Sequence, residues 1–502
     1  MKLAALLPIL CDSEQDRVRC AGVAGLEITA IENDSRRAVP GCMFVALRGA
    51  DKDGHLFIPN AVKAGAAVIV SERTVALPDG VVGFVLPDAR MKLAALAAAF
   101  YGDPTARLHV TGITGTNGKT TTSFRTRSIL EAAGRPTGLL GTIAYRFGER
   151  SIPASNTTPD GLLIQNLFAQ MVDIGLTHAV IEVSSHALAL HRVSSVKFNT
   201  ALFTCLSERE HLDYHGTFDR YRDAKARLFE MLERYGVAVT NADDPLGDYM
   251  AARAPRNCNR LRFGIHNRAD VMAEVTAMDM TGTAYRLRTP AGSAEVRSSF
   301  VGEFNVMNEL AAAACACAAG VELDHIVAGL ERTDQVPGRL ERIPAPGFFP
   351  LVDYAHNEGA LDSVLQTISR LASRRIILVF GCGGDRDRTK RPAMGAVAEK
   401  YCDLVFLTAD NSRSEDTARI IHEIELGMSG AKPHTAIPDR ETAIRAAVHS
   451  ARPGDVVLVA GKGHETYQIF GQVKTPFDDR EVLRRAIAEL DTAQEHAVHA
   501  EA

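Results

Sequence analysis

The chain has 502 residues, of which 46% are hydrophobic and 23% charged, and its formal net charge is −5. This length exceeds what one hydrophobic core supports, so we expect about three domains. The slight acidic surplus argues against a general nucleic-acid binder, because such proteins need an excess of Lys and Arg to displace counterions. Nine scattered cysteines without a C-x-x-C pair predict neither a disulfide framework nor a zinc site, and they fit a reducing cytoplasm.

Residues 1–105 are predicted to form a small N-terminal α/β domain. The leucine-rich opening at 1–11 predicts a core helix rather than a signal segment, because an acidic run follows it directly. Short β-like runs at 43–47, 66–70 and 83–86 alternate with turn signals, and a helix is predicted over 91–101. Apolar stretches all fall short of the roughly 18 residues that a membrane span needs, so no span is expected.

Residues 106–337 are predicted to form a central P-loop ATPase-like domain with a parallel sheet. The order is a strand at 108–113, a glycine loop, and a helix that ends near residue 133 before Gly134 and Pro136. Further apolar runs at 178–183, 200–204 and 236–240 each enter a polar loop, which is typical of strands in a mostly parallel sheet.

Residues 338–502 are predicted to form a smaller, doubly wound, Rossmann-like domain. It begins in a Gly- and Pro-bearing hinge at 335–347. Apolar runs at 375–380, 403–408 and 455–460 alternate with helical stretches that start near Arg391, Thr417 and Arg440. We expect disorder in the chain's last ten residues, 493–502, which are rich in Ala, His and Glu.

The glycine loop at 112–122, GITGTNGKTTT, predicts a phosphate-binding site. Glycines at 112, 115 and 118 permit tight turns with positive φ, so that backbone N–H groups and the following helix N-terminus can face phosphate oxygens. Lys119 is expected against the β- and γ-phosphates, and Thr120 stands where a P-loop hydroxyl meets Mg²⁺. The loop departs from the usual P-loop spacing, because Ile113 occupies the place of the first glycine.

An ordered series of motifs makes the chain resemble the Mur ligases, the ATP-dependent amide-forming enzymes of peptidoglycan precursor synthesis. The series comprises GTNGKTTT, DSRRAVPGCMFVALRG, NTTPD, EVSSHALALHRV, HLDYHGTFDRYRDAKARLF, GEFNVMN, DYAH, FGCGGDRDRTKRP, DNSR and GKGHE. It spans nearly the whole chain. Within the family, the resemblance is greatest to the enzyme that adds a diamino acid to a UDP-linked muramoyl dipeptide. That reaction needs ATP because a carboxylate is a poor electrophile until it is activated, here as an acyl phosphate.

The resemblance implies four catalytic residues: Lys119, Glu182, His211 and Lys225. It also implies a Mg²⁺ site formed by Thr120, Glu182, His211 and Lys225, with the lysine carbamylated by CO₂, since an ammonium cannot bind a cation whereas a carbamate can. The alternative for Glu182 is a solvated carboxylate at a strand end, and the alternative for Lys225 is a solvated lysine on a helix; the neighbouring motif residues favour the metal-binding roles.

Three ligand-binding sets are carried over from the family. The ATP set comprises Gly115, Thr116, Asn117, Gly118, Lys119, Thr120, Thr121, Asn305, Asn308, Arg339 and Asp353. The set for the UDP-linked substrate comprises Ser35, Asn156, Thr157, Thr158, Ser184 and Arg192. The set for the amino acid comprises Arg386, Asp410, Asn411, Ser412, Arg413, Gly461 and Glu465. Arginines can clamp carboxylates and Glu465 can hold an ammonium. The resemblance implies that Arg413 favours meso-diaminopimelate over L-lysine. Asn, Ser and Thr are also common in turns and caps, and Lys462 and His464 could be plain loop residues.

Some positions depart from the family pattern, and they leave the acceptor substrate open. Leu190 replaces a Gln, Cys205 and Glu210 stand near His211, Asn357 and Glu358 follow DYAH, and Ser412 replaces a Pro. One alternative is a paralogous ligase that joins a different carboxylate and amine, and another is a non-enzymatic nucleotide-binding protein. For the enzyme, we expect small-molecule substrates, no nucleic-acid partner, a cytoplasmic location and a monomer.

Overall fold

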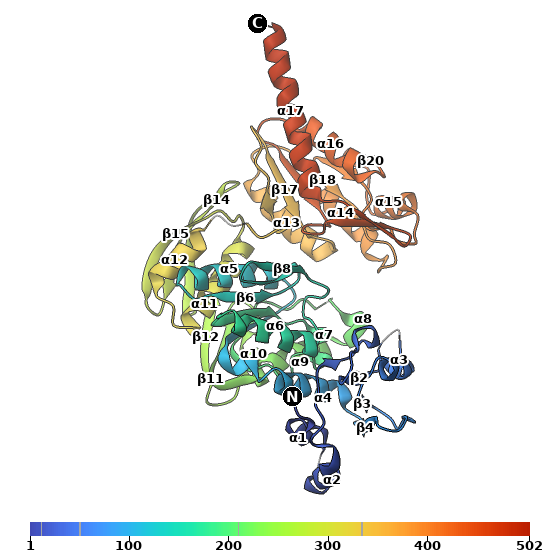
Figure 1. Ribbon diagram of the computed structural model, residues 1–502. Coiled ribbons are helices and arrows are strands. Elements are labelled where there is room, and N and C mark those ends of the chain that lie inside the picture. Colours follow the sequence, from blue (N-terminus) through green and yellow to red (C-terminus); the bar gives the residue numbers. More distant parts are fainter. Residues whose placement is uncertain (12, 50–51, 209, 333–334, 502) are drawn as a thin grey trace. The chain divides into compact units, whose positions relative to one another are not determined.

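The structure is a computed structural model that describes residues 1–11, 13–49, 52–208, 210–332 and 335–501. Figure 1 shows the element order. The chain divides into two compact units, the first formed by residues 1–272, 288–293 and 308–329, and the second by 273–287, 294–307 and 330–502.

The N-terminal part of the first unit contains a four-stranded parallel sheet. Its order is β1 (Ile31–Glu32), β2 (Met43–Ala46), β3 (Val68–Ser71) and β4 (Val82–Val85). Its helices are α3 (Ile58–Lys63) and α4 (Ala89–Phe100). The strand and helix predictions for this part are confirmed. The expected opening helix breaks into two short turns, Leu3–Ala5 and α1 (Leu7–Leu10), before α2 (Glu14–Arg19); its leucines are nevertheless buried in the core.

An eleven-stranded sheet carries the glycine loop. Its order is β15-β14-β13-β12-β11-β10-β5-β9-β6-β7-β8. The strands from β6 through β9, β5, β10, β11 and β12 to β13 pair in parallel, as predicted, whereas β6–β7 and β7–β8 are antiparallel. The central strands are β5 (His109–Thr114), β6 (Thr137–Leu140), β9 (His178–Glu182), β10 (Phe198–Phe203) and β11 (Leu232–Asn241). The outer ones are β7 (Ala144–Phe147), β8 (Arg150–Pro153), β12 (Asn259–Gly264), β13 (Val271–Asp279), β14 (Gly282–Thr289) and β15 (Gly292–Ser298).

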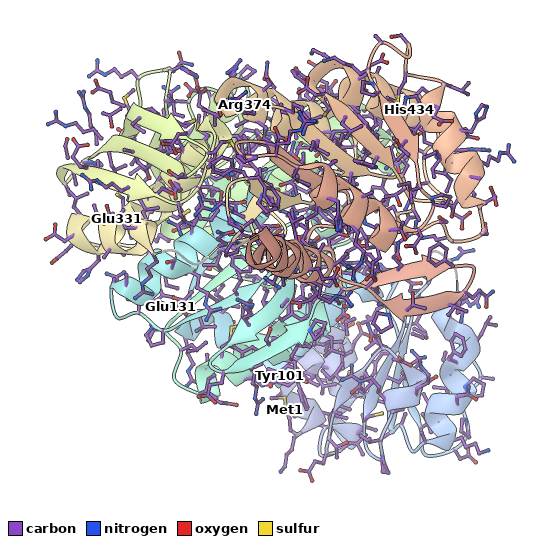
Figure 2. All side chains as sticks on the ribbon, turned by 90° about the horizontal axis from the view of Figure 1, so that it is seen from above. Met1, Tyr101, Glu131, Glu331, Arg374 and His434 are labelled. Atoms are coloured by element: carbon purple, nitrogen blue, oxygen red, sulfur yellow. The ribbon has the colours of Figure 1, made fainter. Side chains whose placement is uncertain are left out.

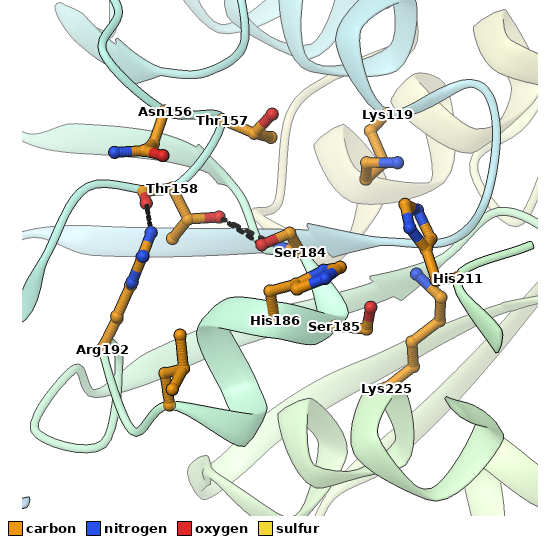
Figure 3. Close-up of a pocket in the computed structure, with 11 residues that line it drawn as sticks. Lys119, Asn156, Thr157, Thr158, Ser184, Ser185, His186, Arg192, His211 and Lys225 are labelled. Carbon is orange, nitrogen blue, oxygen red and sulfur yellow. Dashed lines mark hydrogen bonds between the residues drawn. The ribbon is translucent and has the colours of Figure 1, made fainter. Parts of the chain in front are cut away.

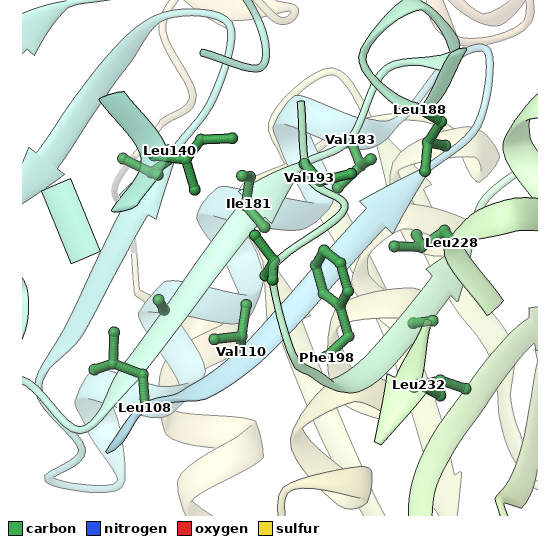
Figure 4. Packing of buried hydrophobic residues seen from close by; sticks show 14 of the residues in the cluster. Leu108, Val110, Leu140, Ile181, Val183, Leu188, Val193, Phe198, Leu228 and Leu232 are labelled. Carbon is green, nitrogen blue, oxygen red and sulfur yellow. The ribbon is translucent and has the colours of Figure 1, made fainter. Parts of the chain in front are cut away.

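Helices connect these strands, and apolar residues from both pack into a buried core (Figure 4). The helices are α5 (Lys119–Ala132), α6 (Gly161–Asp173), α7 (Ser185–Ala189), α8 (Leu212–His215), α9 (Phe218–Glu230), α10 (Gly247–Ala252), α11 (Glu303–Ala318) and α12 (Leu323–Glu331). Gly112 belongs to this core. It lies inside β5, and a Cβ there would meet the Phe198 ring at 2.6 Å. Gly112 therefore makes room for packing, and the expectation that it supplies a positive φ is wrong.

The second unit holds a six-stranded sheet in the order β16-β17-β21-β18-β19-β20. The strands are β16 (Glu341–Arg342), β17 (Phe349–Asp353), β18 (Ile376–Phe380), β19 (Leu404–Leu407), β20 (His434–Ala436) and β21 (Val456–Ala460). All pairs are parallel except β16–β17. A separate antiparallel hairpin joins β22 (Tyr467–Phe470) to β23 (Val473–Pro476).

Alternating side chains of this sheet enter two different cores, because successive residues of a strand point to opposite faces. Leu378 and Leu458 pack with α13 (Glu358–Leu371), α14 (Lys390–Tyr401) and α15 (Thr417–Glu425). Val379 and Val459 pack with α16 (Arg440–Ser450) and α17 (Asp479–Glu501). The doubly wound arrangement is confirmed. The disorder expected at 493–502 stays a prediction; α17 continues to Glu501, and Ala502 lies outside the described residues.

Figure 2 shows the side chains on the ribbon, with landmarks such as Glu131 in the last turns of α5 and His434 at the start of β20. In the part of the chain that the structure describes, no helix has both the length and the apolar character to cross a bilayer.

Candidate functional site

The glycine loop forms a tight turn between β5 and α5. Gly115 has φ +150° and Gly118 has φ +83°. Cβ atoms would lie 1.8 Å from the Thr204 hydroxyl at Gly115 and 2.3 Å from the Asn308 side-chain oxygen at Gly118. Neither space nor backbone geometry therefore admits a larger residue. Because α5 begins directly at Lys119, the N–H groups of its first turn and its dipole favour an anion there.

The polar groups of this loop form hydrogen bonds within the protein. Lys119 folds back, and its ammonium donates to the carbonyls of Gly115 and Thr116, at 2.8 Å each. The Thr116 hydroxyl lies 2.9 Å from the Tyr221 hydroxyl, and the Asn117 carbonyl accepts from Thr204 at 2.6 Å. The predicted contact of Lys119 with phosphates therefore requires its ammonium to exchange carbonyl partners for phosphate oxygens.

Glu182 is a buried carboxylate at the carboxyl end of β9, beside the loop. Its side chain accepts hydrogen bonds from the Thr120 hydroxyl at 3.0 Å, from the Thr142 hydroxyl at 2.8 Å and from the Thr142 backbone N–H at 3.0 Å. The residue is 0% exposed. All three donors are neutral, and within the described residues no cationic side chain pairs with Glu182. A buried carboxylate without a positive partner is costly, so this position suits a cation.

His211 and Lys225 both lie beside the ring of Tyr221. The imidazole of His211 packs against the rings of His186 and Tyr221, with centroids 5.1 Å and 5.6 Å away. Burial, followed by the charges of nearby basic groups, lowers the pKa of His211 to about 4. Its imidazole is therefore neutral at physiological pH and can act as a ligand.

Lys225 on α9 is only 2% exposed. Its amine donates to the Gly115 carbonyl at 2.8 Å and lies 4.8 Å from the centre of the Tyr221 ring. Burial is the main cause that lowers the pKa of Lys225 well below its usual value, and the charge of Lys119 adds to the effect. A neutral amine is the form that can react with CO₂.

Lys119, His211 and Lys225 line a pocket of about 310 Å³ (Figure 3). Thr120 and Glu182 are not among its lining residues. The pocket brings together Lys119, His211 and Lys225 with most of the set predicted for the UDP-linked substrate: Asn156, Thr157, Thr158, Ser184 and Arg192. The guanidinium of Arg192 donates to the Thr158 carbonyl at 2.9 Å, and the Thr158 hydroxyl donates to Ser184 at 3.3 Å. Ser35, at the start of a short 3₁₀ turn (Ser35–Arg37), does not line this pocket.

Two lining residues, Ser185 and His186, were not assigned a role from the sequence. The Ser185 hydroxyl lies 3.0 Å from Nε2 of His215. Both belong to the quoted EVSSHALALHRV motif, so the signal was present, but the sequence gives no way to tell which serine faces a ligand. Leu190 also lines the pocket, so this departure from the family pattern touches the site directly.

The other residues predicted for ATP fall into both units. Asn308 lies beside Gly118 in the first unit. In the second unit, Asn305 donates from its side chain to the Val301 carbonyl at 2.9 Å. Asp353 accepts from the backbone N–H groups of Leu340 and Ala355, and burial raises its pKa. The guanidinium of Arg339 lies 4.6 Å from the centre of the Tyr354 ring.

The residues predicted for the amino acid lie in loops that follow β18, β19 and β21. Carboxyl ends of neighbouring parallel strands are where such sheets bind ligands. Arg413 has φ +49° and donates to the Gly384 carbonyl at 2.7 Å. Arg386 is exposed, and among the described residues its guanidinium donates only to the Asp385 carbonyl, at 3.4 Å. At Gly461, a Cβ would lie 2.9 Å from an Asp410 carboxylate oxygen, so the loops approach closely there.

Lys462 is buried, whereas the sequence left open that it is a plain residue of a surface loop. It is 0% exposed, and its ammonium donates to Glu465 at 3.0 Å and to Asn411 at 3.2 Å. Ser412 is buried too and shares a hydrogen bond with Thr417 at 2.7 Å.

Most of the remaining departures have a structural explanation. Asn357 caps α13, because its side-chain oxygen accepts from the Ala360 N–H at 2.8 Å, and Glu358 follows in the first turn, where the helix dipole favours acids. The sulfur of Cys205 lies 3.8 Å from the Asn117 carbonyl oxygen. Glu210 lies just before His211 in the segment that the sequence singled out, and Arg209 of that segment lies outside the described residues.

Family models cover the chain in three consecutive parts. They are described as "Mur ligase family, catalytic domain" at residues 27–101, "Mur ligase middle domain" at 113–316 and "Mur ligase, glutamate ligase domain" at 338–463. A curated relative from Geobacillus kaustophilus is 47% identical over 471 residues, which cover 92% of this chain and 95% of that protein. The chain belongs to the Mur ligase family. It is therefore a ligase with the three-part α/β architecture of that family.

The names of individual relatives are more specific than the family descriptions. The Geobacillus kaustophilus protein is named UDP-N-acetylmuramoyl-L-alanyl-D-glutamate–2,6-diaminopimelate ligase, as is a Geobacter metallireducens protein with 42% identity over 98% of this chain and 99% of its own. A Roseiflexus relative, 44% identical over 92% of this chain and 95% of its own, is named UDP-N-acetylmuramyl-tripeptide synthetase. A solved structure of a ligase with the first of these names matches 98% of this chain and 99% of its own at 32% identity, with a TM-score of 0.71.

Proposed function

We propose that this Mur ligase adds meso-2,6-diaminopimelate to UDP-N-acetylmuramoyl-L-alanyl-D-glutamate in an ATP-dependent reaction. The observation that carries the proposal is the single pocket in which Lys119, Arg192 and Lys225 meet. It combines a phosphate-binding loop with polar groups that suit an anionic, carboxylate-bearing substrate. The names of the relatives at 42–47% identity agree with this reaction.

The chemistry proceeds in two steps. A carboxylate oxygen of the muramoyl dipeptide attacks the γ-phosphorus of ATP, and ADP leaves, which gives an acyl phosphate. The amine nitrogen of diaminopimelate then attacks the acyl carbon, inorganic phosphate leaves, and the nitrogen loses a proton. Lys119 and the N–H groups of the loop stabilise negative charge on the transferring phosphoryl group by position and charge. Arg192 and the hydroxyls of Thr158 and Ser184 orient the dipeptide.

The residues present fit Mg²⁺. The carboxylate of Glu182 is buried with neutral donors only, and the Thr120 hydroxyl beside it is a second hard oxygen ligand. We assign the metal to Thr120 and Glu182, and to His211 together with a carbamate on Lys225. When bound, the ion would neutralise charge on the phosphates.

Carbamylation of Lys225 is a balanced step: the neutral amine attacks the carbon of CO₂, and one proton is released. The lowered pKa of Lys225, caused mainly by burial, supports it, because only the unprotonated amine is nucleophilic.

We further assign residues 1–105, including Ser35, to the UDP-linked substrate, 106–337 to ATP, and 338–502 to the amino acid. Asn305, Asn308, Arg339 and Asp353 would hold the adenosine, with Gly115, Thr116, Asn117, Gly118 and Thr121 around the phosphates. Arg386, Asp410, Asn411, Ser412, Arg413, Gly461 and Glu465 form the proposed amino-acid site. We propose a cytoplasmic monomer, which light scattering on the purified protein would test.

The direct test is phosphate release by the purified protein with ATP, Mg²⁺ and the UDP-linked dipeptide, across a panel of amines. We expect meso-diaminopimelate to react faster than L-lysine, and equal rates would contradict the choice of amine. Because Leu190 gives the pocket an apolar wall, a second candidate is a ligase for a different carboxylate. A panel of acceptor carboxylates separates the two, since no phosphate release with the muramoyl dipeptide would favour the second.

A further inference from the structure

Three polar side chains form a connected cluster in the second unit. Lys462 follows β21, Asn411 follows β19, and Glu465 lies in the turn after Lys462, where its backbone N–H donates to the Lys462 carbonyl at 2.9 Å. Lys462, Asn411 and Glu465 together form the cluster. Burial of Lys462 requires a partner for its charge, and Glu465 provides it at 3.0 Å.

Hydrogen bonds fix the orientation of the Asn411 amide. Its oxygen accepts from the Lys462 ammonium at 3.2 Å and from the Ile469 backbone N–H at 3.0 Å. Two donors on one side identify that atom as the oxygen, so the amide nitrogen must face Glu465. It donates there at 2.9 Å. Both the oxygen and the nitrogen of the Asn411 amide therefore already form hydrogen bonds within the protein.

Both donors in the cluster reach the same oxygen of Glu465. The Lys462 ammonium and the Asn411 amide each donate to Oε2. Among the described residues, Oε1 has no hydrogen-bond partner, and the Glu465 side chain is 18% exposed, whereas Lys462 is fully buried. The carboxylate is thus held by one oxygen, and the other is presented from a fixed position.

We propose that Lys462 is a positioning residue for the amino-acid substrate. It holds Glu465 through Oε2, with the help of Asn411, so that Oε1 is left to accept from a substrate ammonium. The inference rests on the proposed function and deepens it. It divides the residues predicted for the amino acid into Glu465, which would contact the ligand, and Asn411, which acts through Glu465.

The test compares two substrates that differ in one ammonium group, meso-diaminopimelate and 2-aminopimelate. In Lys462→Met, whose side chain has a similar length and no charge, we expect the preference in kcat/KM for diaminopimelate to fall about tenfold, the size typical of a lost charged hydrogen bond. The KM for ATP should stay unchanged. A purely structural role would lower kcat/KM for both amines equally, and this result would overturn the proposal.

A double-mutant cycle tests whether Lys462 acts through Glu465. We expect Lys462→Met combined with Glu465→Gln to show the same preference as Glu465→Gln alone, whereas additive losses would overturn the inference. Asn411→Ala, which removes only the second donor to Oε2, should weaken the preference in the same direction and serves if Lys462→Met folds poorly. The matched control is Lys474→Met, because Lys474 is an exposed lysine on the neighbouring hairpin, over the Tyr467 ring at 3.6 Å.

Hydroxylamine, which traps an acyl phosphate without needing the amino-acid site, separates this inference from the proposed function. If the wild type releases no ADP with the UDP-linked dipeptide and hydroxylamine, the proposed function and this inference both fail. If every variant releases ADP normally with hydroxylamine and also keeps its preference for diaminopimelate, only the role of Lys462 fails.

Discussion

Two buried lysines, one in each unit, have opposite surroundings. Lys225 in the first unit donates to a backbone carbonyl, and among the described residues it forms no ion pair. Lys462 in the second unit pairs with the carboxylate of Glu465 and with an amide. A carboxylate partner offsets the cost of burying a lysine, and the lysine can hold that partner in place. A buried lysine without such a partner tends to lose its proton, as the proposed carbamylation of Lys225 requires.

The largest expected effect comes from removing the unpaired lysine. Lys225→Met should reduce ligase activity about 10²–10³-fold, the usual loss when one group that stabilises transition-state charge is removed. Phosphate release measures it. Depleting CO₂ should slow the wild type and leave the variant unaffected. Lys63→Met, on the exposed end of α3, is the control. Wild-type activity in Lys225→Met would show that Lys225 is not needed for the reaction, and the difference in surroundings between the two lysines would then have no functional consequence.

The second prediction concerns Gly115, whose carbonyl accepts from both Lys119 and Lys225. Gly115→Ala should raise the KM for ATP by about tenfold or more, because its Cβ would collide with Thr204 and the loop must shift. Gly134→Ala is the control, since Gly134 also has a positive φ, +69°, with no atom within 4 Å of the added Cβ. It should lose about 1 kcal/mol of stability without a change in the KM for ATP. Equal kinetic effects in both variants would mean that the loop tolerates a side chain.

The third prediction compares the stabilities of the two lysine variants. Lys462→Met should lower the free energy of unfolding by about 1–3 kcal/mol, because Glu465 loses its charged partner. Lys225→Met should lower it by less than about 1 kcal/mol or raise it, since the Gly115 carbonyl still accepts from Lys119. Urea unfolding in buffer free of Mg²⁺ and bicarbonate measures both. The reverse order of stabilities would show that Lys225 has a charged partner in solution.

The smallest change is expected in the pH dependence of stability, which tests whether His109, another basic group of the first unit, also remains uncharged. Burial, with a smaller contribution from Arg135, lowers the pKa of His109 from 6.5 to about 4. Between these values the unfolded chain binds a proton that the folded protein does not, so stability should fall as the pH drops from 6.5 to 4. His109→Gln should remove about 1–2 kcal/mol of this pH dependence. Urea unfolding at both pH values measures it, and an unchanged slope would contradict the lowered pKa.

Much of the fold could be predicted because its signals are local. The run from β5 through the glycine loop into α5 follows from apolar residues, glycines and a helix start within one short segment. The parallel strands of both units likewise show as apolar runs that enter polar loops. The local pattern gave a wrong prediction at Gly112, because a glycine that packing requires looks the same in the sequence as a glycine that a turn requires.

The family motifs, their order and the residue types that can perform phosphoryl transfer are all readable from the chain alone. Which of those residues meet depends on how the chain folds. Lys225 reaches a carbonyl 110 positions earlier in the chain because β5 and β10 pair in parallel. Lys462 reaches Asn411, 51 positions earlier, because the loops after β19 and β21 leave the same edge of one sheet. The burial of each lysine arises from such long-range strand pairing, which no local pattern encodes.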